Sequence, residues 1–212
     1  DAVISDVSKR FNVKLNIILA NVEVIDFRVL GGLYDETVQL ITMDENIKNV
    51  EDLRGKSVSI GEAGSGVYFN AMDVLEAADI TLDDIKPQYQ SFEASKEALK
   101  DGKIQAAFIV AGAPTTAITE LATTNGVYLV NIEGDLRDKI IAACPYYSPL
   151  QIPADTYPGQ PDPIETITVK ATVIVSANLD EDFYIISGPD LNRVNNVTLN
   201  CEFTILIHCK SG

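Results

Sequence analysis

Basic residues are scarce in this 212-residue sequence: 16 lysines and arginines stand against 31 aspartates and glutamates, a formal net charge of −15. A polyanion would meet a surface of its own sign, so binding to nucleic acid or anionic membranes is disfavoured. Long apolar runs are also absent, because no stretch approaches the roughly 20 residues of a membrane span. The first residues, DAVISDVSKRF, lack the basic start and apolar core of a signal peptide. We therefore expect a mature or trimmed soluble protein.

Histidine and cysteine are equally rare. The single histidine, His208, lies in the apolar run FTILIHC without a catalytic partner beside it, which argues against most Ser-His and Cys-His hydrolases and most zinc enzymes. The three cysteines, Cys144, Cys201 and Cys209, have no metal-ligand spacing. Cys201 and Cys209 form either a disulfide or, as we favour, two separate thiols. We expect no metal and no cofactor.

The composition, with 46% hydrophobic residues, is that of a globular protein. Between Val50 and Ile132 the apolar pattern alternates between the periods of strands and helices. This alternation predicts an α/β fold with mostly parallel sheets and helices on both faces. The expected strands are 57–61, 87–92, 104–110 and 127–132; the expected helices are 66–78, 93–102 and a third between Pro114 and Asn125.

Two glycine-containing loops follow predicted strands, GEAGSG (61–66) and AGAPT (111–115). Ligands of open α/β sheets bind outside the carboxyl ends of the strands, where these loops are expected. Backbone amides at a helix start suit a carboxylate or a phosphate. The spacing matches neither the P-loop nor the dinucleotide pattern. For the first loop alone, a tight turn without a ligand is an equal alternative.

The two loops contain little that is able to catalyse a reaction. Apart from Glu62 they lack lysine, histidine and carboxylates, so no nucleophile stands beside a base. Gly112 allows a ligand to approach the backbone, and Thr115 offers a hydroxyl at a helix start. We therefore expect binding without catalysis and name no catalytic residue.

The segment 144–163 contains six prolines and predicts an ordered surface excursion that takes no part in the core. Its tyrosines, Tyr146, Tyr147 and Tyr157, either cover a ligand cleft or pack on the surface beside proline. The β-branched run ITVKATVIVSA that follows is expected to cross between two lobes.

Several motifs occur together between Arg28 and Tyr184: LYDETVQLIT, DLRGKSVSIGEAGSGVYFN, DGKIQAAFIVAGAPT, PYYSPLQIPADTYPGQ and VKATVIVSANLDED. In this order they resemble the solute receptors of the TAXI type, which serve tripartite ATP-independent periplasmic (TRAP) transporters. Receptors of the aliphatic sulfonate and nitrate type share the DLRGKSV and DGKIQAA patterns but not TYPGQ.

The resemblance implies a type II periplasmic-binding-protein fold, in which two α/β lobes close on a small ligand. Residues 49–132 would be the second lobe, and residues 1–48 with 133–212 would form the crossing strands and part of the first lobe. The family's glycine- and threonine-rich loop is not found before Leu33, so the first lobe is expected to be incomplete. Ser187-Gly188-Pro189 interrupts a long helix of the family, and the tail 187–212 has no assignment.

The resemblance also implies a function. The protein would be periplasmic, or extracellular and membrane-anchored, and would deliver a small organic anion such as glutamate or a dicarboxylate to TRAP membrane subunits. It would not be an enzyme. Val67 stands where the family usually has threonine, so one hydroxyl contact would be missing. The expected ligand-binding residues are Gly64, Ser65, Gly66, Val67, Gly112, Pro114 and Thr115, with Tyr34 and Tyr157 as further candidates.

Two alternatives remain open. One is a degenerate or isolated lobe that has lost its ligand and acts as a surface antigen or interaction module. The other is a transferase on a similar scaffold that binds phosphate at the glycine loop, which would require a basic or nucleophilic residue nearby.

Overall fold

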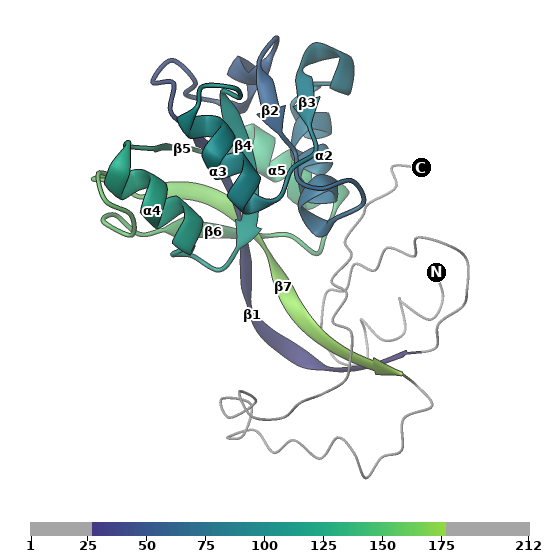
Figure 1. Cartoon of the computed structure of the whole chain (residues 1–212). Helices are drawn as coiled ribbons and strands as arrows, with labels where there is room; N and C mark the ends of the chain where they lie inside the picture. The colour runs from purple at the N-terminus through teal and green to yellow at the C-terminus, as the bar shows by residue number, and fades with distance from the viewer. Residues whose placement is uncertain (1–26, 177–212) are drawn as a thin grey trace.

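The computed structural model describes residues 27–176 of the chain (Figure 1). Strands and helices alternate through most of this range. The strands are β1 (Phe27–Thr42), β2 (Ser57–Ser59), β3 (Lys86–Gln88), β4 (Ala106–Ala111), β5 (Tyr128–Val130), β6 (Ser148–Ile152) and β7 (Ile164–Ser176). The helices are α2 (Gly66–Ala77), α3 (Phe92–Lys100), α4 (Thr116–Thr124) and α5 (Gly134–Ala143), with short 3₁₀ turns at Val50–Leu53 and Leu82–Asp84.

All seven strands belong to one sheet, in the order β3-β2-β4-β1-β7-β6, with β5 also paired to β1. Strands β2, β3 and β4 are mutually parallel, while β1 is antiparallel to β4, β5 and β7. The four strands expected from the sequence, β2 to β5, therefore all run in the same direction. This part of the prediction is confirmed, with β1 inserted between β4 and β5 in the opposite direction.

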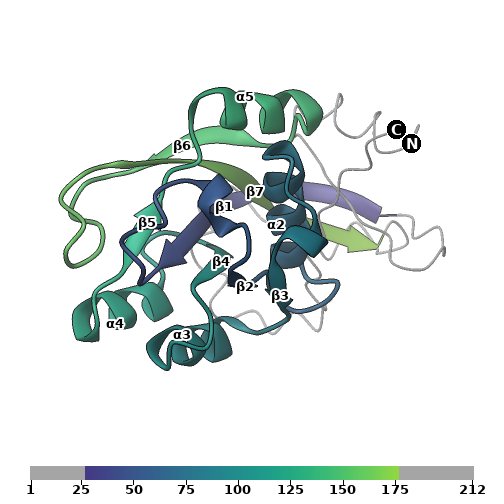
Figure 2. The same ribbon diagram turned by 90° about the horizontal axis from the view of Figure 1, so that it is seen from above.

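Helices cover both faces of the sheet, as predicted. Figure 2 shows α5 on one side of the sheet and α3 and α4 on the other. Strand β1 serves both layers because its side chains alternate in direction. Val38 and Leu40 join the cluster that includes Val74 of α2 and Ile140 of α5, while Ile41 joins the cluster of α3 and α4. The fold class is therefore confirmed as α/β.

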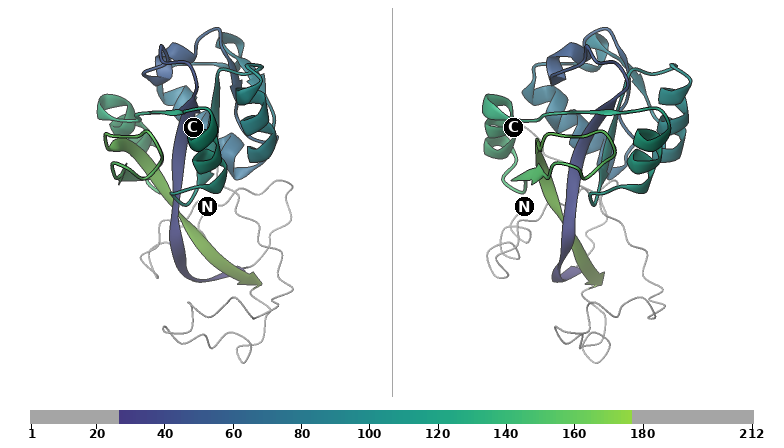
Figure 3. Two further views of the ribbon diagram at one scale, coloured as in Figure 1. Left: turned by 60° about the vertical axis from the view of Figure 1, so that its left-hand side comes forward. Right: turned by 90° about the vertical axis from the view of Figure 1, so that its left-hand side faces the viewer.

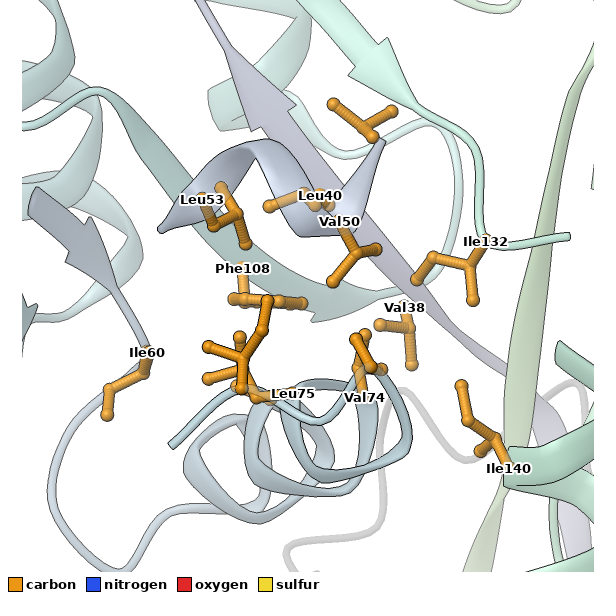
Figure 4. Close-up of a cluster of buried hydrophobic side chains, with 14 of the residues drawn as sticks. Val38, Leu40, Val50, Leu53, Ile60, Val74, Leu75, Phe108, Ile132 and Ile140 are labelled. Carbon is orange, nitrogen blue, oxygen red and sulfur yellow. The ribbon is translucent and has the colours of Figure 1, made fainter. Parts of the chain in front are cut away.

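The larger hydrophobic cluster lies between α2, α5 and the sheet (Figure 4). Phe108 of β4 and Leu75 of α2 are at most 1% exposed, and Val50 and Leu53 cover them from the 3₁₀ turn. Each such side chain contributes on the order of 1.5–3 kcal/mol through burial. This packing fixes where α2 begins relative to the end of β2.

The predicted helix boundaries are close to the observed ones because the capping residues are local. Ser65 and Ser91 accept hydrogen bonds from the amides of Tyr68 and Ala94, three residues further on, and so cap α2 and α3. Gly102 and Gly126 follow α3 and α4 with positive φ values of 66° and 77°. Helix α5 was not predicted.

Strands β1 and β7 continue beyond the body of the molecule as a two-stranded antiparallel ribbon, seen from the side in Figure 3. The ribbon pairs Asp35 with Lys170 and Glu36 with Val169 before both strands enter the sheet. The β-branched run of the sequence is therefore a long strand, as expected.

The prediction that segment 144–163 stays out of the core was wrong. It contains strand β6, which pairs with β7, and Tyr147, Ile152 and Tyr157 are at most 1% exposed. The two tyrosines therefore neither cover a cleft nor lie on the surface. Their hydroxyls are hydrogen-bonded inside the protein, which makes burial of such large polar rings favourable.

Several sequence-based statements concern residues outside the described range: the pairing of Cys201 with Cys209, the role of His208, the interruption at Ser187-Gly188-Pro189 and the tail 187–212. Cys144 lies inside the range and is buried. Between residues 27 and 176 no helix has the length and apolar character that a membrane span requires.

Candidate functional site

Three loops meet at one edge of the sheet, where the parallel strands β2, β3 and β4 end. Each strand leads into a helix, so the starts of α2, α3 and α4 lie at this edge, on strands about 4.8 Å apart. Strand β1 enters the sheet at the same edge, because Thr37 pairs with Ala111 at the end of β4. The sequence predicted two of these loops together; the structure adds a third.

The first loop depends on glycine for a steric reason. Gly61 has φ +83°, and a Cβ on it would lie 2.7 Å from Cβ of Val67. The turn therefore brings the start of α2 against the end of β2, with Val67 packed on Gly61. Gly64 also has a positive φ, +76°, but its side is open.

Ser65 is the N-cap of α2, and its hydroxyl oxygen accepts a hydrogen bond of 3.2 Å from the Tyr68 amide. Its own amide donates to the Glu62 carbonyl at 2.9 Å. Among residues 27–176 the amides of Gly66 and Val67 have no acceptor. Two donors at the positive end of a twelve-residue helix are therefore free to meet an anionic group.

The second loop, Ala111 to Thr115, is held by side chains from distant parts of the chain. The Thr115 amide donates to the Tyr157 hydroxyl at 2.9 Å, and that hydroxyl donates to Oε1 of Gln39. Nε2 of Gln39 donates to the Thr115 hydroxyl at 2.9 Å and to the Ala111 carbonyl at 3.3 Å. The Thr115 hydroxyl in turn donates to the Gly112 carbonyl at 2.9 Å.

Tyr34 lies beside the same loop. A Cβ on Gly112 would be 3.8 Å from the Tyr34 ring, an ordinary contact, so Gly112 is not required by sterics here. Half of Tyr34 is exposed, and its hydrogen bond to Glu36 raises the pKa of its hydroxyl to about 12. Burial raises the pKa of the Glu36 carboxyl, and the bond from Tyr34 opposes that rise.

The third loop, Tyr89 to Ser91, was not named from the sequence as part of a site. The Tyr89 ring is 49% exposed and its centroid lies 6.1 Å from that of Tyr68 in the first turn of α2. Oε1 of Gln90 is buried and lacks a donor in the described part of the chain. A signal was present in the sequence, because the predicted strand 87–92 leads directly into the predicted helix 93–102.

Charge is sparse at this edge. Glu62 is the only charged residue in the three loops, and Lys170 of the ribbon lies 2.6 Å from the Asp35 carboxylate. Within residues 27–176 no group of three or more histidines, cysteines or carboxylates is placed to hold a metal ion. The chemistry available is hydrogen bonding by amides, hydroxyls and side-chain amides.

The structure brings the predicted residues together unequally. Gly112, Thr115 and Tyr157 are joined by hydrogen bonds, the Tyr34 ring lies beside Gly112, and Pro114 is exposed in the same loop. Residues 64–67 belong to the neighbouring loop, because β2 and β4 are adjacent strands. Whether these residues contact a ligand stays a prediction.

The sequence matches the model of the NMT1-like family over residues 18–185. The chain belongs to this family. This chain spans less than two thirds of the length of each of the three solved structures that follow.

The periplasmic aliphatic sulphonate binding protein from Escherichia coli is 22% identical, with a TM-score of 0.42, over 50% of this chain and 36% of its own. The alkanesulfonate-binding protein from Xanthomonas axonopodis pv. citri, bound to MOPS, is 23% identical, with a TM-score of 0.40 and the same coverage. An ancestral arginine-binding protein bound to arginine is 19% identical, with a TM-score of 0.41, over 80% of this chain and 63% of its own.

Proposed function

We propose that this NMT1-like protein is an extracytoplasmic solute-binding receptor that captures a small organic anion without transforming it. The observation that carries the proposal is the pair of free amides at Gly66 and Val67, at the start of a helix whose loop has glycine where a side chain would collide. Such a helix start binds carboxylates and other anions through its amides and dipole.

The absence of a nucleophile and base within the three loops supports binding over catalysis. The net charge of −15 does not oppose the proposal. Surface carboxylates farther away than roughly 10 Å are screened by salt, whereas the amides act in direct contact with the ligand.

In the proposed receptor, residues 49–132 are the second lobe, and residues 1–48 and 133–212 supply the crossing strands and part of the first lobe. The β1–β7 ribbon suits the crossing role because it leaves the body of the sheet as two paired strands. The motifs of the sequence further favour a TAXI receptor for glutamate or a dicarboxylate, with TRAP membrane subunits as partners. Gly64, Ser65, Gly66 and Val67 would hold the anionic group, and Gly112, Pro114 and Tyr34 would line the wall.

The test uses a proline at the first helical position of α2. Gly66→Pro removes one free amide, and proline is well accepted there because Ser65 already has the extended φ and ψ of −76° and 162°. Gly66→Ala is the matched control, since it keeps the amide. Titration calorimetry of the whole chain with glutamate, 2-oxoglutarate and succinate, and with methanesulfonate and arginine as further probes, measures the result.

We expect at least one anion to bind the wild type and the Gly66→Ala variant. Gly66→Pro should bind it about ten-fold more weakly or worse, because a hydrogen bond to a charged group is worth about 1.5–3 kcal/mol. Equal affinity of the two variants would contradict the assignment of the anion to this helix start. Absence of heat with every probe would instead favour a lobe that acts as an interaction module or surface antigen. The second loop is the observation that favours this alternative, because the Thr115 amide and hydroxyl are already hydrogen-bonded to Tyr157 and Gln39.

A further inference from the structure

The hydroxyl of Tyr157 and the side-chain amide of Gln39 meet at the start of α4, although they come from opposite ends of the described chain. Both residues are 1% exposed. Both side chains bond to the loop 111–115 from inside the protein, so neither is exposed to solvent at the edge of the sheet. Each polar side-chain atom of these two residues is hydrogen-bonded to the loop or to the other residue.

Tyr157 is itself held in place by the rest of the TYPGQ motif. Oε1 of Gln160 accepts from the Tyr157 amide at 3.2 Å, and Nε2 of Gln160 donates to the carbonyls of Pro153 and Asp162 at 3.0 and 2.8 Å. Gly159 has a positive φ of 79°, which tightens the turn between the two residues. The motif is thus a closed loop that presents one buried hydroxyl to the start of α4.

Gln39 belongs to a different part of the fold. It lies on β1, opposite Ile109 of β4, and on the face of the sheet that carries α3 and α4. One amide group donates to both Ala111 and Thr115 and accepts from Tyr157, so it ties the first and last residues of the loop to each other and to the motif. A buried side chain with all its bonds made holds its neighbours in one geometry.

We propose that Gln39 and Tyr157 are positioning residues of the ligand site: they hold loop 111–115 and the first turn of α4 in the binding geometry without touching the ligand. This inference rests on the proposed function, and it gives Tyr157 and the Thr115 hydroxyl a different role from the ligand contact expected from the sequence. The amides after Thr115 remain for a ligand, whereas the Thr115 amide does not.

The experiment has two measurements on the whole chain. Hydrogen exchange followed by NMR reports whether the Thr115 amide and the first turn of α4 open, and calorimetry with glutamate, 2-oxoglutarate and succinate reports affinity. Tyr157→Phe removes only the hydroxyl. Thr42→Val is the matched control, because Thr42 is also fully buried on β1 and donates to the Gln105 carbonyl at 2.6 Å, at the far end of the strand.

We expect Tyr157→Phe to speed exchange of the Thr115 amide at least ten-fold and to weaken anion binding about ten-fold, since small misplacements of a binding group have large effects. Thr42→Val should change neither the exchange rate of the Thr115 amide nor the affinity for the anion, even if it lowers the melting temperature as much as Tyr157→Phe does. The double variant Tyr157→Phe/Gln39→Met should lose no more affinity than Tyr157→Phe, because the two residues act through one network. If Tyr157→Phe fails to fold, Thr115→Val, which removes the hydroxyl that Gln39 holds, takes its place with the same expectation.

Three results would overturn the inference in distinguishable ways. Faster exchange with unchanged affinity would show that the network supports the fold and does not position the site. Absence of anion binding by the wild type, with faster exchange in Tyr157→Phe, would refute the proposed function, and the positioning role would fall with it. Unchanged exchange together with bound anion would leave the proposed function intact and refute the network's role alone.

Discussion

The hydroxyl of Tyr147 provides the sharpest test of the energetics of this fold. Tyr147 is 0% exposed, donates to Oδ2 of Asp73 at 2.8 Å and accepts from Nδ2 of Asn70 at 2.7 Å. These bonds join α2 to the segment that follows α5. Tyr147→Phe removes the hydroxyl and leaves the ring in its place.

The expected loss in the free energy of unfolding is about 2 kcal/mol at pH 7. A hydrogen bond to a charged group contributes about 1.5–3 kcal/mol, and the Asn70 donor left without its acceptor adds to the cost. Tyr146→Phe is the comparison, because Tyr146 donates to the same Asp73 oxygen at 2.8 Å but is only half-buried. We expect its loss to be smaller, about 1 kcal/mol.

The same substitution changes the response to alkaline pH. Burial raises the pKa of the Tyr147 hydroxyl well above its ordinary value of 10.0, and the neighbouring Asp73 charge adds to the rise. Above about pH 10 the unfolded chain loses this proton while the folded protein keeps it, so stability present below pH 10 is lost as the pH rises. Tyr147→Phe should therefore make the decline shallower by about 1.4 kcal/mol per pH unit.

Urea unfolding followed by circular dichroism, at pH 7 and at intervals from pH 9.5 to 11.5, measures both effects. The reasoning is refuted if Tyr147→Phe costs less than about 0.5 kcal/mol at neutral pH. It is also refuted if the alkaline slopes of the variant and the wild type coincide, because the folded protein would then not retain the proton.

Two further pairs of variants test the first loop and the core. Gly61→Ala should lower the free energy of unfolding by about 2–3 kcal/mol, because its methyl group would collide with Val67 in addition to the strain of φ +83°. Gly64→Ala should lower it by only about 1 kcal/mol, since a Cβ there meets no other atom. Equal losses in urea unfolding would contradict the steric argument. Phe108→Ala, in the centre of the larger cluster, should lower the free energy of unfolding by about 3–5 kcal/mol. Tyr128→Ala, at a residue that is 51% exposed, should change it by no more than about 0.5 kcal/mol. Thermal melts check both, and a small loss at Phe108 would show that the core repacks.

Much of the α/β pattern was available from the sequence because its causes are local. Ser65 and Ser91 cap helices through their own next turn, and Gly102 and Gly126 end helices through their own backbone conformation. Helix α5 was missed because Leu136 and Ile140 are followed by no strong helix stop, and its N-cap, Glu133, makes no side-chain bond. The local sequence signal for α5 is weak, and its packing against α2 stabilises the helix instead.

The candidate site was only partly predictable for a different reason. That loops 61–66 and 111–115 lie together follows from parallel strands with helices between them, and the sequence contains that alternation. That Thr115 is already bonded does not follow, because its partners, Gln39 and Tyr157, are 76 and 42 residues away in the chain. No local pattern records a contact at such separation.

Residues within a few positions of one another fix the alternation of strands and helices, the caps that begin the helices, the glycine turns and the lack of charged catalytic groups in those turns, so local patterns were enough to find these features. Contacts between distant parts of the chain place β1 antiparallel beside β4, bring Tyr147 and Tyr157 of the proline-rich segment into the core, and leave particular loop amides free. Those outcomes depend on which distant side chain can pair with each buried polar group. In a close-packed interior each such group has room for only one set of partners.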